Sequence, residues 1–316
     1  MKRVFLFIIA LITCTMSVRA QSDMQLSQYF LGMGYYNPAY AGTTGDLNML
    51  GLFRQQWIGI PNAGTSFFVI ADMPLKLGSL NNGIGLVVNT ESIGLFQFTK
   101  VAFQYAYKQK LFGGTLSIGL QGGIYNVGFD GTKIHIPESP DHTPVESDPA
   151  LPSTSVQAMA LDVNAGIYYT HKNFYAGFGA THLTAPEMAL GETTNYYIPM
   201  GLNLTGGYNI QLRNPLYELQ PSVFLKTDMQ TFQADITARM VYNKMFNGGL
   251  SWRINESVVV LLGATFGRLQ VGYAYDFPTT AMLKGSSGSH EVLVRYQLKL
   301  KKTKTGKNRH KSVRIL

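Results

Sequence analysis

The nine residues KVAFQYAYK (Lys100–Lys108) alternate strictly between two kinds of side chain. Positions 101, 103, 105 and 107 are apolar or aromatic, whereas the positions between them are small or polar. A period of two indicates a β-strand whose two faces meet different surroundings. Segments 232–240 and 291–299 repeat this alternation, and 158–169 and 268–276 behave alike. The sequence therefore predicts an all-β protein.

Such alternation fits a soluble β-sandwich with its apolar face inside, or a membrane barrel with its apolar face outside. The segments are about ten residues long, which suits a tilted membrane strand. The other face, rich in Gly, Ser, Gln and charge, suits a lumen. Aromatic residues also lie near segment ends, where interfacial girdles occur: Tyr168, Tyr169, Tyr196, Tyr197, Tyr273 and Tyr275. We therefore expect a transmembrane antiparallel β-barrel, with the soluble sandwich as the alternative.

About 14 strands can be delimited by this pattern, and an even number is the rule for single-chain bacterial barrels. Their expected ranges are 46–57, 64–75, 83–90, 94–108, 113–127, 157–171, 173–184, 196–210, 217–226, 231–242, 247–254, 257–266, 268–277 and 290–300. The three longest connections, 128–156, 185–195 and 278–289, all follow odd-numbered strands and so share one end of the barrel. Because outer-membrane barrels have long external loops and short periplasmic turns, we expect both termini in the periplasm of a Gram-negative cell.

The two ends of the chain differ in character from the middle. Lys2 and Arg3, a short apolar run and the small residues before Gln21 predict a signal peptide over residues 1–20. Cleavage there removes the single cysteine, Cys14, and with it disulfide and thiolate chemistry. The expected organisation is a periplasmic or lumenal lead-in over 21–45, a barrel over 46–300 and a basic periplasmic tail over 301–316.

The formal charge of +8 is concentrated at these ends. Three basic residues lie in the predicted signal, and eight lie between Lys299 and Arg314. All 18 acidic residues fall between them, so the body of the mature chain is mildly acidic. A nucleic-acid partner is not expected, because such proteins spread basic residues over a folded face. The tail is interpreted as a solvated segment or a contact for anionic headgroups or an acidic partner.

Charged residues on the polar faces of the strands form a candidate lumen network. Its members are Glu218, Asp235, Arg239, Arg253, Arg268, Asp276, Glu291 and Arg295. Charges in a partly dry interior need neutralising partners. The network is therefore interpreted either as structural cross-strand pairing or as the lining of a selective pore.

The sequence offers little for catalysis, cofactors or metals. The six histidines lack metal-ligand spacing, and no phosphate-binding loop or nucleophile elbow is present. We therefore expect no catalytic residues, no cofactor-binding residues and no resident metal. The connection 128–156 is rich in acidic residues and proline, but it lacks the spacing of a calcium loop. It is interpreted as a solvated external loop.

The first stretch of the mature chain carries a second kind of information. In GYYNPAYAG (Gly34–Gly42), Asn37-Pro38 favours a turn between three tyrosines. The larger segment Gln25–Gly42, followed by FRQQWIGIP (Phe53–Pro61), resembles the opening of the PorP/SprF family of Bacteroidota outer-membrane proteins. Tyr275–Phe277, Gly288–Glu291 and the following VLVRYQL resemble the last hairpin of that family.

This resemblance implies an outer-membrane barrel of the type IX secretion and gliding machinery. It implies periplasmic ring or lipoprotein components as partners, and a large secreted adhesin or other cargo that the barrel docks or anchors at the cell surface. Outer-membrane lipid is the remaining expected partner. The basic tail departs from the family, whose chains commonly end soon after the last strand.

We expect residues 24–43 to fold into the lumen or against the periplasmic mouth, either as a rigid lead-in or as a plug or docking surface. The candidate residues are Tyr35, Tyr36, Asn37, Pro38, Tyr40, Arg54 and Trp57. The expected function is a secretion or gliding subunit that docks a surface protein and contacts the periplasmic ring. The alternative is a passive outer-membrane transporter of small solutes.

Overall fold

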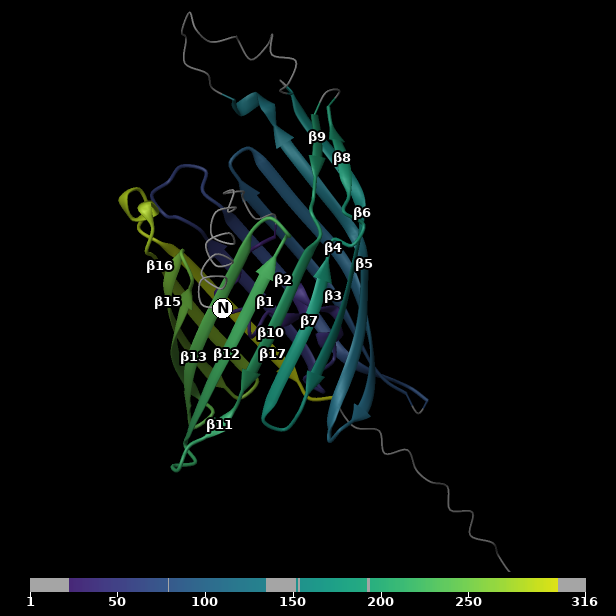
Figure 1. Ribbon diagram of the computed structural model, residues 1–316, viewed down its shortest axis with the longest axis vertical. Helices are drawn as coiled ribbons and strands as arrows, with labels where there is room; N and C mark the ends of the chain where they lie inside the picture. The colour runs from purple at the N-terminus through teal and green to yellow at the C-terminus, as the bar shows by residue number, and fades with distance from the viewer. Residues whose placement is uncertain (1–22, 79, 135–151, 153, 192–193, 301–316) are drawn as a thin grey trace, which may run out of the picture.

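The computed structural model describes residues 23–78, 80–134, 152, 154–191 and 194–300. Within them, a 15-stranded antiparallel sheet closes on itself (Figure 1). Fourteen of these strands form the barrel wall, and the two-residue β11 extends the neighbouring strand. The closed barrel and the strand count therefore confirm the sequence prediction.

The wall follows chain order, with two short interruptions. Its strands are β1 (Leu47–Gln55), β2 (Thr65–Leu77), β3 (Leu80–Ile93), β4 (Phe96–Leu111), β5 (Gly114–Asp130), β6 (Ser155–Thr170), β7 (Phe174–Thr181), β10 (Gly201–Tyr208), β12 (Tyr217–Thr227), β13 (Phe232–Tyr242), β14 (Phe246–Arg253), β15 (Ser257–Phe266), β16 (Leu269–Pro278) and β17 (Ser289–Leu298). The seam joins β1 to β17, with Leu47 opposite Leu298 and Gln55 opposite His290. The interruptions are β11 (Ile210–Gln211) and a separate hairpin of β8 (Glu187–Leu190) and β9 (Thr194–Tyr197).

Alternation along β4 shows which face is which. Phe103 is 55% exposed on the outside, whereas Gln104 is fully buried in the lumen. In hydrocarbon every backbone donor and acceptor needs a partner, which a closed barrel supplies. A polar lumen and an apolar exterior are therefore the arrangement of an outer-membrane barrel and not of a soluble sandwich.

We call the two ends of the barrel the upper and lower mouths, as oriented in Figure 1. β1 ends and β17 begins at the upper mouth, whereas β1 begins and β17 ends at the lower one. The connections β5–β6, β7–β10 and β16–β17 all lie at the upper mouth, as their strand order requires. Residues 135–151 of the acidic connection lie outside the described residues, so its interpretation stays a prediction.

Two sequence expectations about aromatic residues are wrong. The expected strand 196–210 is shorter, because Tyr196 and Tyr197 belong to the β8–β9 hairpin. Tyr196 packs there on Phe96 and Phe98, inside the part of β4–β6 that extends above the wall. Tyr168 is buried in the lumen, because neighbours in a strand point to opposite faces and only one residue of the pair 168–169 can face lipid.

The segment before β1 fills the lumen, and we call residues 23–46 the lumenal segment. It contains the helical turn α2 (Met33–Tyr36) and the 3-10 turn η1 (Pro38–Tyr40). Two further 3-10 turns, η2 (Gly131–Lys133) and η4 (Ala281–Lys284), lie in upper connections. Among the described residues, no helix is both long and apolar enough to cross a membrane.

The lumenal segment crosses the barrel from mouth to mouth. Asp23 contacts Thr181 and Lys226, whose strands end at the upper mouth. The segment then descends to the start of β1 at the lower mouth, where the last described residues also lie. The first and last described residues therefore lie at opposite mouths. The ends of the wall, β1 and β17, meet at the lower mouth. The expectation that both termini are periplasmic stays a prediction, because residues 1–22 and 301–316 lie outside the described residues.

Candidate functional site

The interface between the lumenal segment and the barrel wall is the candidate site. Several residues of the wall that touch this segment are glycines. A Cβ on Gly119 of β5 would lie 2.5 Å from Pro38 C and from Ala39 Cα. A Cβ on Gly83 would lie 2.6 Å from Ala41 C, and one on Gly179 would lie 2.6 Å from Tyr36 O. Because real Cβ atoms do not approach so closely, only glycine lets the two backbones touch at these positions.

Asn37 joins the lumenal segment to two strands of the wall. Its side-chain oxygen accepts a hydrogen bond from Ala39 N at 3.0 Å and so caps η1, in which Pro38 is the first residue. Its amide group donates to Ile167 O on β6 at 3.0 Å and to Phe178 O on β7 at 3.2 Å. Asn37 therefore caps η1 and also bonds the lumenal segment to the barrel wall.

The tyrosines of the segment pack on aromatic residues of the wall. Tyr36 packs on Phe224 with ring centroids 4.6 Å apart, and Tyr35 meets Phe68 edge-on at 5.3 Å. Tyr40 meets Tyr168 edge-on at 5.4 Å. Such pairs stabilise by about 0.5–1.5 kcal/mol beyond the burial of their area.

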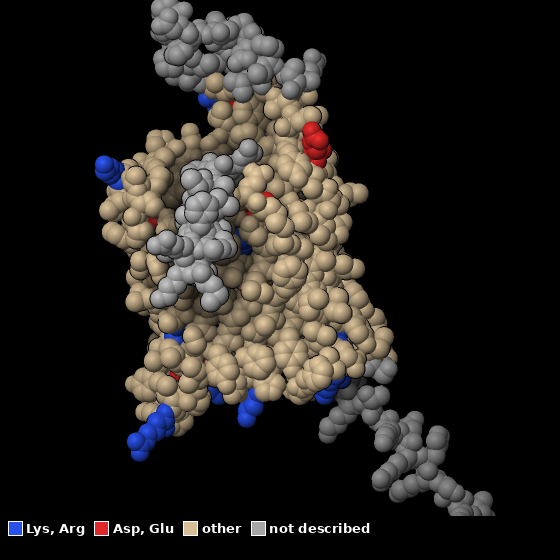
Figure 2. Space-filling model, viewed as in Figure 1, with Lys and Arg blue, Asp and Glu red and all other residues tan. Residues whose placement is uncertain are grey.

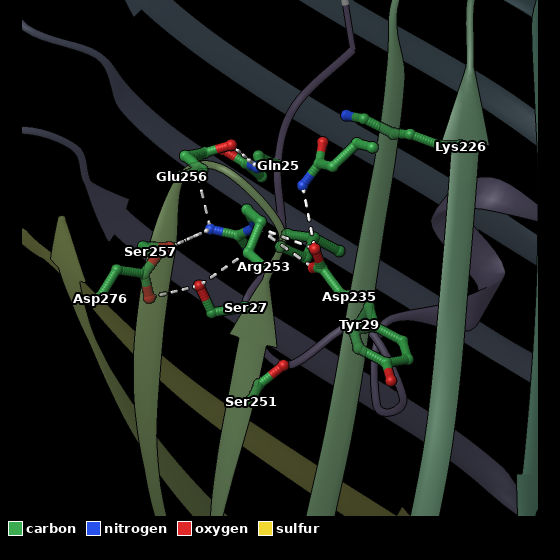
Figure 3. Close-up of polar contacts among 12 residues, drawn as sticks. Gln25, Ser27, Tyr29, Lys226, Asp235, Ser251, Arg253, Glu256, Ser257 and Asp276 are labelled. Carbon is green, nitrogen blue, oxygen red and sulfur yellow. Dashed lines mark hydrogen bonds and ion pairs between the residues drawn. The ribbon is translucent and has the colours of Figure 1, made fainter. Parts of the chain in front are cut away.

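A cluster of buried charges holds the upper half of the segment (Figure 3). Arg253 lies between Asp235, at 3.2 Å, and Asp276, at 2.9 Å. Arg54 contacts the same Asp276 at 2.7 Å and Glu291 at 3.5 Å. Strands β1, β13, β14, β16 and β17 supply these five residues.

The lumenal segment completes the bonding of this cluster. Glu291 accepts the backbone N–H groups of Ser27, at 2.7 Å, and Gln28, at 2.9 Å. The Ser27 hydroxyl donates to Asp276 at 2.6 Å and accepts from Arg54 at 2.8 Å. Buried charges are tolerated only when paired and hydrogen-bonded. The wall therefore depends on the segment for part of its polar bonding, and the segment depends on the wall for its position.

A second cluster ties the start of the segment to the upper rim. Lys100 contacts Asp162 at 2.9 Å, and His182 lies between Asp162, at 2.8 Å, and Asp23, at 3.0 Å. Burial by itself would lower the pKa of His182, but the Asp23 and Asp162 carboxylates outweigh it and raise that pKa to about 9. Burial alone would raise the pKa of Asp23, but the His182 charge beside it lowers that pKa. His182 is thus a cation at neutral pH and pairs with Asp23.

At the lower mouth, the end of the segment is held by a third set of polar contacts. Asp72 accepts from Gly42 N at 2.8 Å and from Asn48 at 2.7 Å. Lys108 donates to the Thr43 hydroxyl at 2.9 Å. The segment is therefore fixed at both mouths and between them.

The structure separates the residues predicted for the lumen network. Asp235, Arg253, Asp276 and Glu291 meet in the upper cluster described above. Arg239 lies over the Phe30 ring at 3.6 Å and donates to Gln220, to which Glu218 is also bonded. Arg295 donates to Asn48 at 2.6 Å. Arg268 was misplaced, because it lies exposed in the β15–β16 turn, where alternation along a strand no longer applies.

The predicted plug and docking residues divide by exposure. Tyr35, Tyr36, Asn37 and Arg54 are at most 3% exposed, Pro38 is buried and Tyr40 is half-buried. Trp57 lies at the upper mouth and lines a cavity of about 260 Å³ together with Asp23, Gln25, Gln56, Glu91 and Glu256. Trp57 is half-buried, like Tyr40, and is the member of this predicted set that lines the cavity.

Sequence reasoning missed Asp23, Ser27, Lys100, Asp162, His182 and Lys226. Lys100 and Asp162 could have been found, because each is a charge on the polar face of an expected strand, like Asp235. Ser27 and His182 gave no such signal. Ser27 bonds to Asp276, which is 249 positions away in the chain. His182 lies in the loop after β7 and pairs with the distant Asp23. Among the described residues, no group of three or more His, Cys, Asp or Glu side chains could hold a metal ion.

The barrel is similar in shape to solved outer-membrane proteins. The toluene transporter TbuX of Ralstonia pickettii superposes with a TM-score of 0.48 and 11% identity, over 84% of this chain and 92% of that chain. A TodX deletion mutant, described as a monoaromatic hydrocarbon channel, gives a TM-score of 0.47 and 9% identity over 92% and 98% of the two chains. The translocator domain of the autotransporter NalP from Neisseria meningitidis gives 0.41 and 9% over 81% and 88%. No curated protein sequence matches the chain.

The match to a protein family is more specific. Residues 18–296 fit the family described as type IX secretion system membrane protein PorP/SprF. That range includes the whole lumenal segment and nearly all of the barrel wall. Because the match covers most of the chain, this closed barrel with its lumenal segment belongs to the PorP/SprF family of type IX secretion membrane proteins.

Proposed function

We propose that this protein serves the type IX secretion and gliding machinery as a closed docking or anchoring subunit. The upper mouth faces the exterior and holds a secreted surface protein, and the lower mouth faces the periplasmic ring. The observation that carries this proposal is the lumenal segment, which is buried along the barrel and bonded to the wall at both mouths. A lumen filled in this way suits a scaffold better than a path for solutes.

The upper mouth supports docking by its shape and contents. β4, β5 and β6 extend above the wall, and their lumenal face is covered by Met188 and Leu190 of β8 and by Ile198, which follows β9. Trp57 and the cavity beside it lie at the same mouth. Interfaces are enriched in tryptophan within such pockets. We assign Trp57 as the first contact of the secreted protein.

Conductance separates the docking function from the alternative, a passive transporter. The full-length protein in planar bilayers is expected to pass little current, and deletion of residues 24–43 is expected to open the barrel. Large and steady conductance of the intact protein would favour a transporter. Unchanged conductance of a correctly assembled deletion variant would contradict the plug.

The partners require tests in the native cell. Deleting the gene is expected to remove one secreted protein from the cell surface while general export continues. Trp57→Ala is expected to weaken retention of that protein, whereas Trp252→Ala, on the outer face of β14, is the matched control. Truncation after Leu300 tests the tail, because undiminished recovery of periplasmic ring components would remove it as a contact.

A further inference from the structure

The six turns that join barrel strands at the lower mouth share one feature. Each turn contains, or is flanked within two residues by, one exposed basic residue. In order around the barrel these are Lys76, Lys110, Lys172, Arg213, Lys244 and Arg268, and we call them the basic belt. Figure 2 shows blue side chains along the lower edge of the molecule. The barrel thus carries a ring of positive charge at one end.

The upper mouth is different. Among the described residues of its connections, Lys133 is paired with Asp130 at 2.9 Å, and Lys284 is the other lysine. Acidic residues such as Asp228 and Glu256 lie in the upper turns instead. At the lower end, the acidic residues of the described part are Asp46 beside the start of β1, Glu218 in β12 and the buried Asp72 in β2. The charge asymmetry therefore runs along the barrel axis.

The members of the basic belt are not neutralised by acidic residues in the described part of the barrel. In the described part of the chain, no salt bridge involves any of its six members. All six side chains are exposed, in contrast to the buried Arg54 and Arg253. Six unpaired cations at one end of the barrel repel one another, and an external anion beside them offsets that repulsion.

The neighbours of these cations indicate which anion that is. Exposed apolar or aromatic residues flank each turn: Leu77, Leu80, Leu111, Phe112, Phe174, Leu212, Tyr217, Tyr242, Phe246, Phe266 and Leu269. Phe112, next to Lys110, is 86% exposed. Aromatic residues beside basic ones mark the level where hydrocarbon meets headgroups. A soluble acidic partner would not require exposed apolar side chains beside every cation around the whole circumference.

We propose that the basic belt binds the phosphates of anionic phospholipid headgroups in the leaflet at the lower mouth. It would thereby fix the depth and orientation of the barrel in that leaflet. Lys299 follows β17 at the same mouth. This proposal does not depend on the secretion function, because it concerns only the lipid-facing rim.

The test uses the full-length protein in lipid discs that contain equal amounts of phosphatidylglycerol and phosphatidylcholine. After gentle detergent extraction, mass spectrometry measures the ratio of the two lipids that remain bound. The intact protein is expected to enrich phosphatidylglycerol roughly tenfold at low salt, with the enrichment falling as salt is raised. A variant with all six belt residues replaced by Gln is expected to lose it.

Two controls make the result specific. Lys133→Gln with Lys284→Gln removes charge from the upper mouth and is expected to keep the enrichment. Replacing the four belt lysines by Arg keeps the charge and is expected to keep the enrichment as well. Resistance to SDS at room temperature, with altered migration after heating, checks that each barrel is folded. If the sixfold variant does not fold, variants of alternate turns are expected to lose about half of the enrichment on a logarithmic scale.

Several outcomes would overturn the proposal. Equal enrichment in the sixfold variant and the intact protein would remove the basic belt as a lipid site. Loss of enrichment on truncation after Leu300 alone would assign it to the tail. Belt-dependent binding of polyglutamate without enrichment of phosphatidylglycerol would replace the lipid by an acidic protein partner.

Discussion

Gly119→Ala tests the contact between the lumenal segment and the wall most directly. The added methyl group would lie 2.5 Å from Pro38 C and from Ala39 Cα, whereas ordinary carbon contacts begin at about 3.5 Å. Either the segment or β5 therefore has to move by roughly 1 Å. Such overpacking lowers the free energy of unfolding by about 1–3 kcal/mol. The displacement also strains the Asn37 hydrogen bonds to Ile167 and Phe178, which lie beside this contact.

The assay is thermal unfolding in detergent together with single-barrel conductance. Gly119→Ala is expected to unfold at a lower temperature than the intact protein and to pass more current, because the segment is less firmly seated. Gly122→Ala lies on the same strand with nothing within 4 Å of the added methyl group, so it is expected to be neutral. The pair differs only in which face of β5 receives the methyl group.

A double-mutant cycle completes the test. In a barrel that lacks residues 24–43, Gly119→Ala has nothing to collide with and is expected to cost nothing. A penalty that persists in the deleted barrel would show that Gly119 serves the wall and not the segment. Equal behaviour of the Gly119 and Gly122 variants in the intact chain would equally refute the close contact.

The remaining predictions concern charge. Because the pKa of His182 is raised to about 9 in the folded protein, its pairing with Asp23 stabilises fully below about pH 6.5 and is lost as pH rises through about 9. The shift of this pKa corresponds to about 3 kcal/mol of folding free energy. In His182→Gln, the loss of stability between about pH 6.5 and pH 9, measured by thermal unfolding, should therefore disappear. A profile unchanged by the substitution would dismiss the pair. Arg54→Met removes the buried cation that pairs with Asp276 and Glu291. The free energy of unfolding, measured with urea in vesicles, is expected to fall by about 3–5 kcal/mol. A cost below 1 kcal/mol would mean that the cluster rearranges freely. Phe103→Arg places a charge on the lipid face of β4 and is expected to lower the free energy of unfolding by about 2–4 kcal/mol near the midplane. Phe112→Arg, in the exposed turn at the lower end of the same strand, should lower it by less than about 1 kcal/mol. Equal costs would contradict the membrane embedding.

The positions of the strands could be predicted because each strand carries its own signal. Along Lys100–Lys108, one face meets lipid and the other the lumen, so the period of two is visible without any distant contact. Even the order of the wall follows from chain order, since antiparallel neighbours in a barrel need only short turns. Prediction was wrong where alternation stops, as at Arg268 in a turn and at Tyr196 in the β8–β9 hairpin.

The sequence by itself determined that this chain forms a barrel of about 14 strands, because lipid imposes a local and repeated choice of side chain. Only the tertiary structure decided what fills the barrel. Ser27 meets Asp276 across 249 positions of the chain, and Asn37 meets Phe178 across 141. Such contacts depend on which wall residues face the segment at one height of the barrel. That height depends on the tilt and stagger of all the strands around the closed barrel, which the pattern of a single strand does not specify.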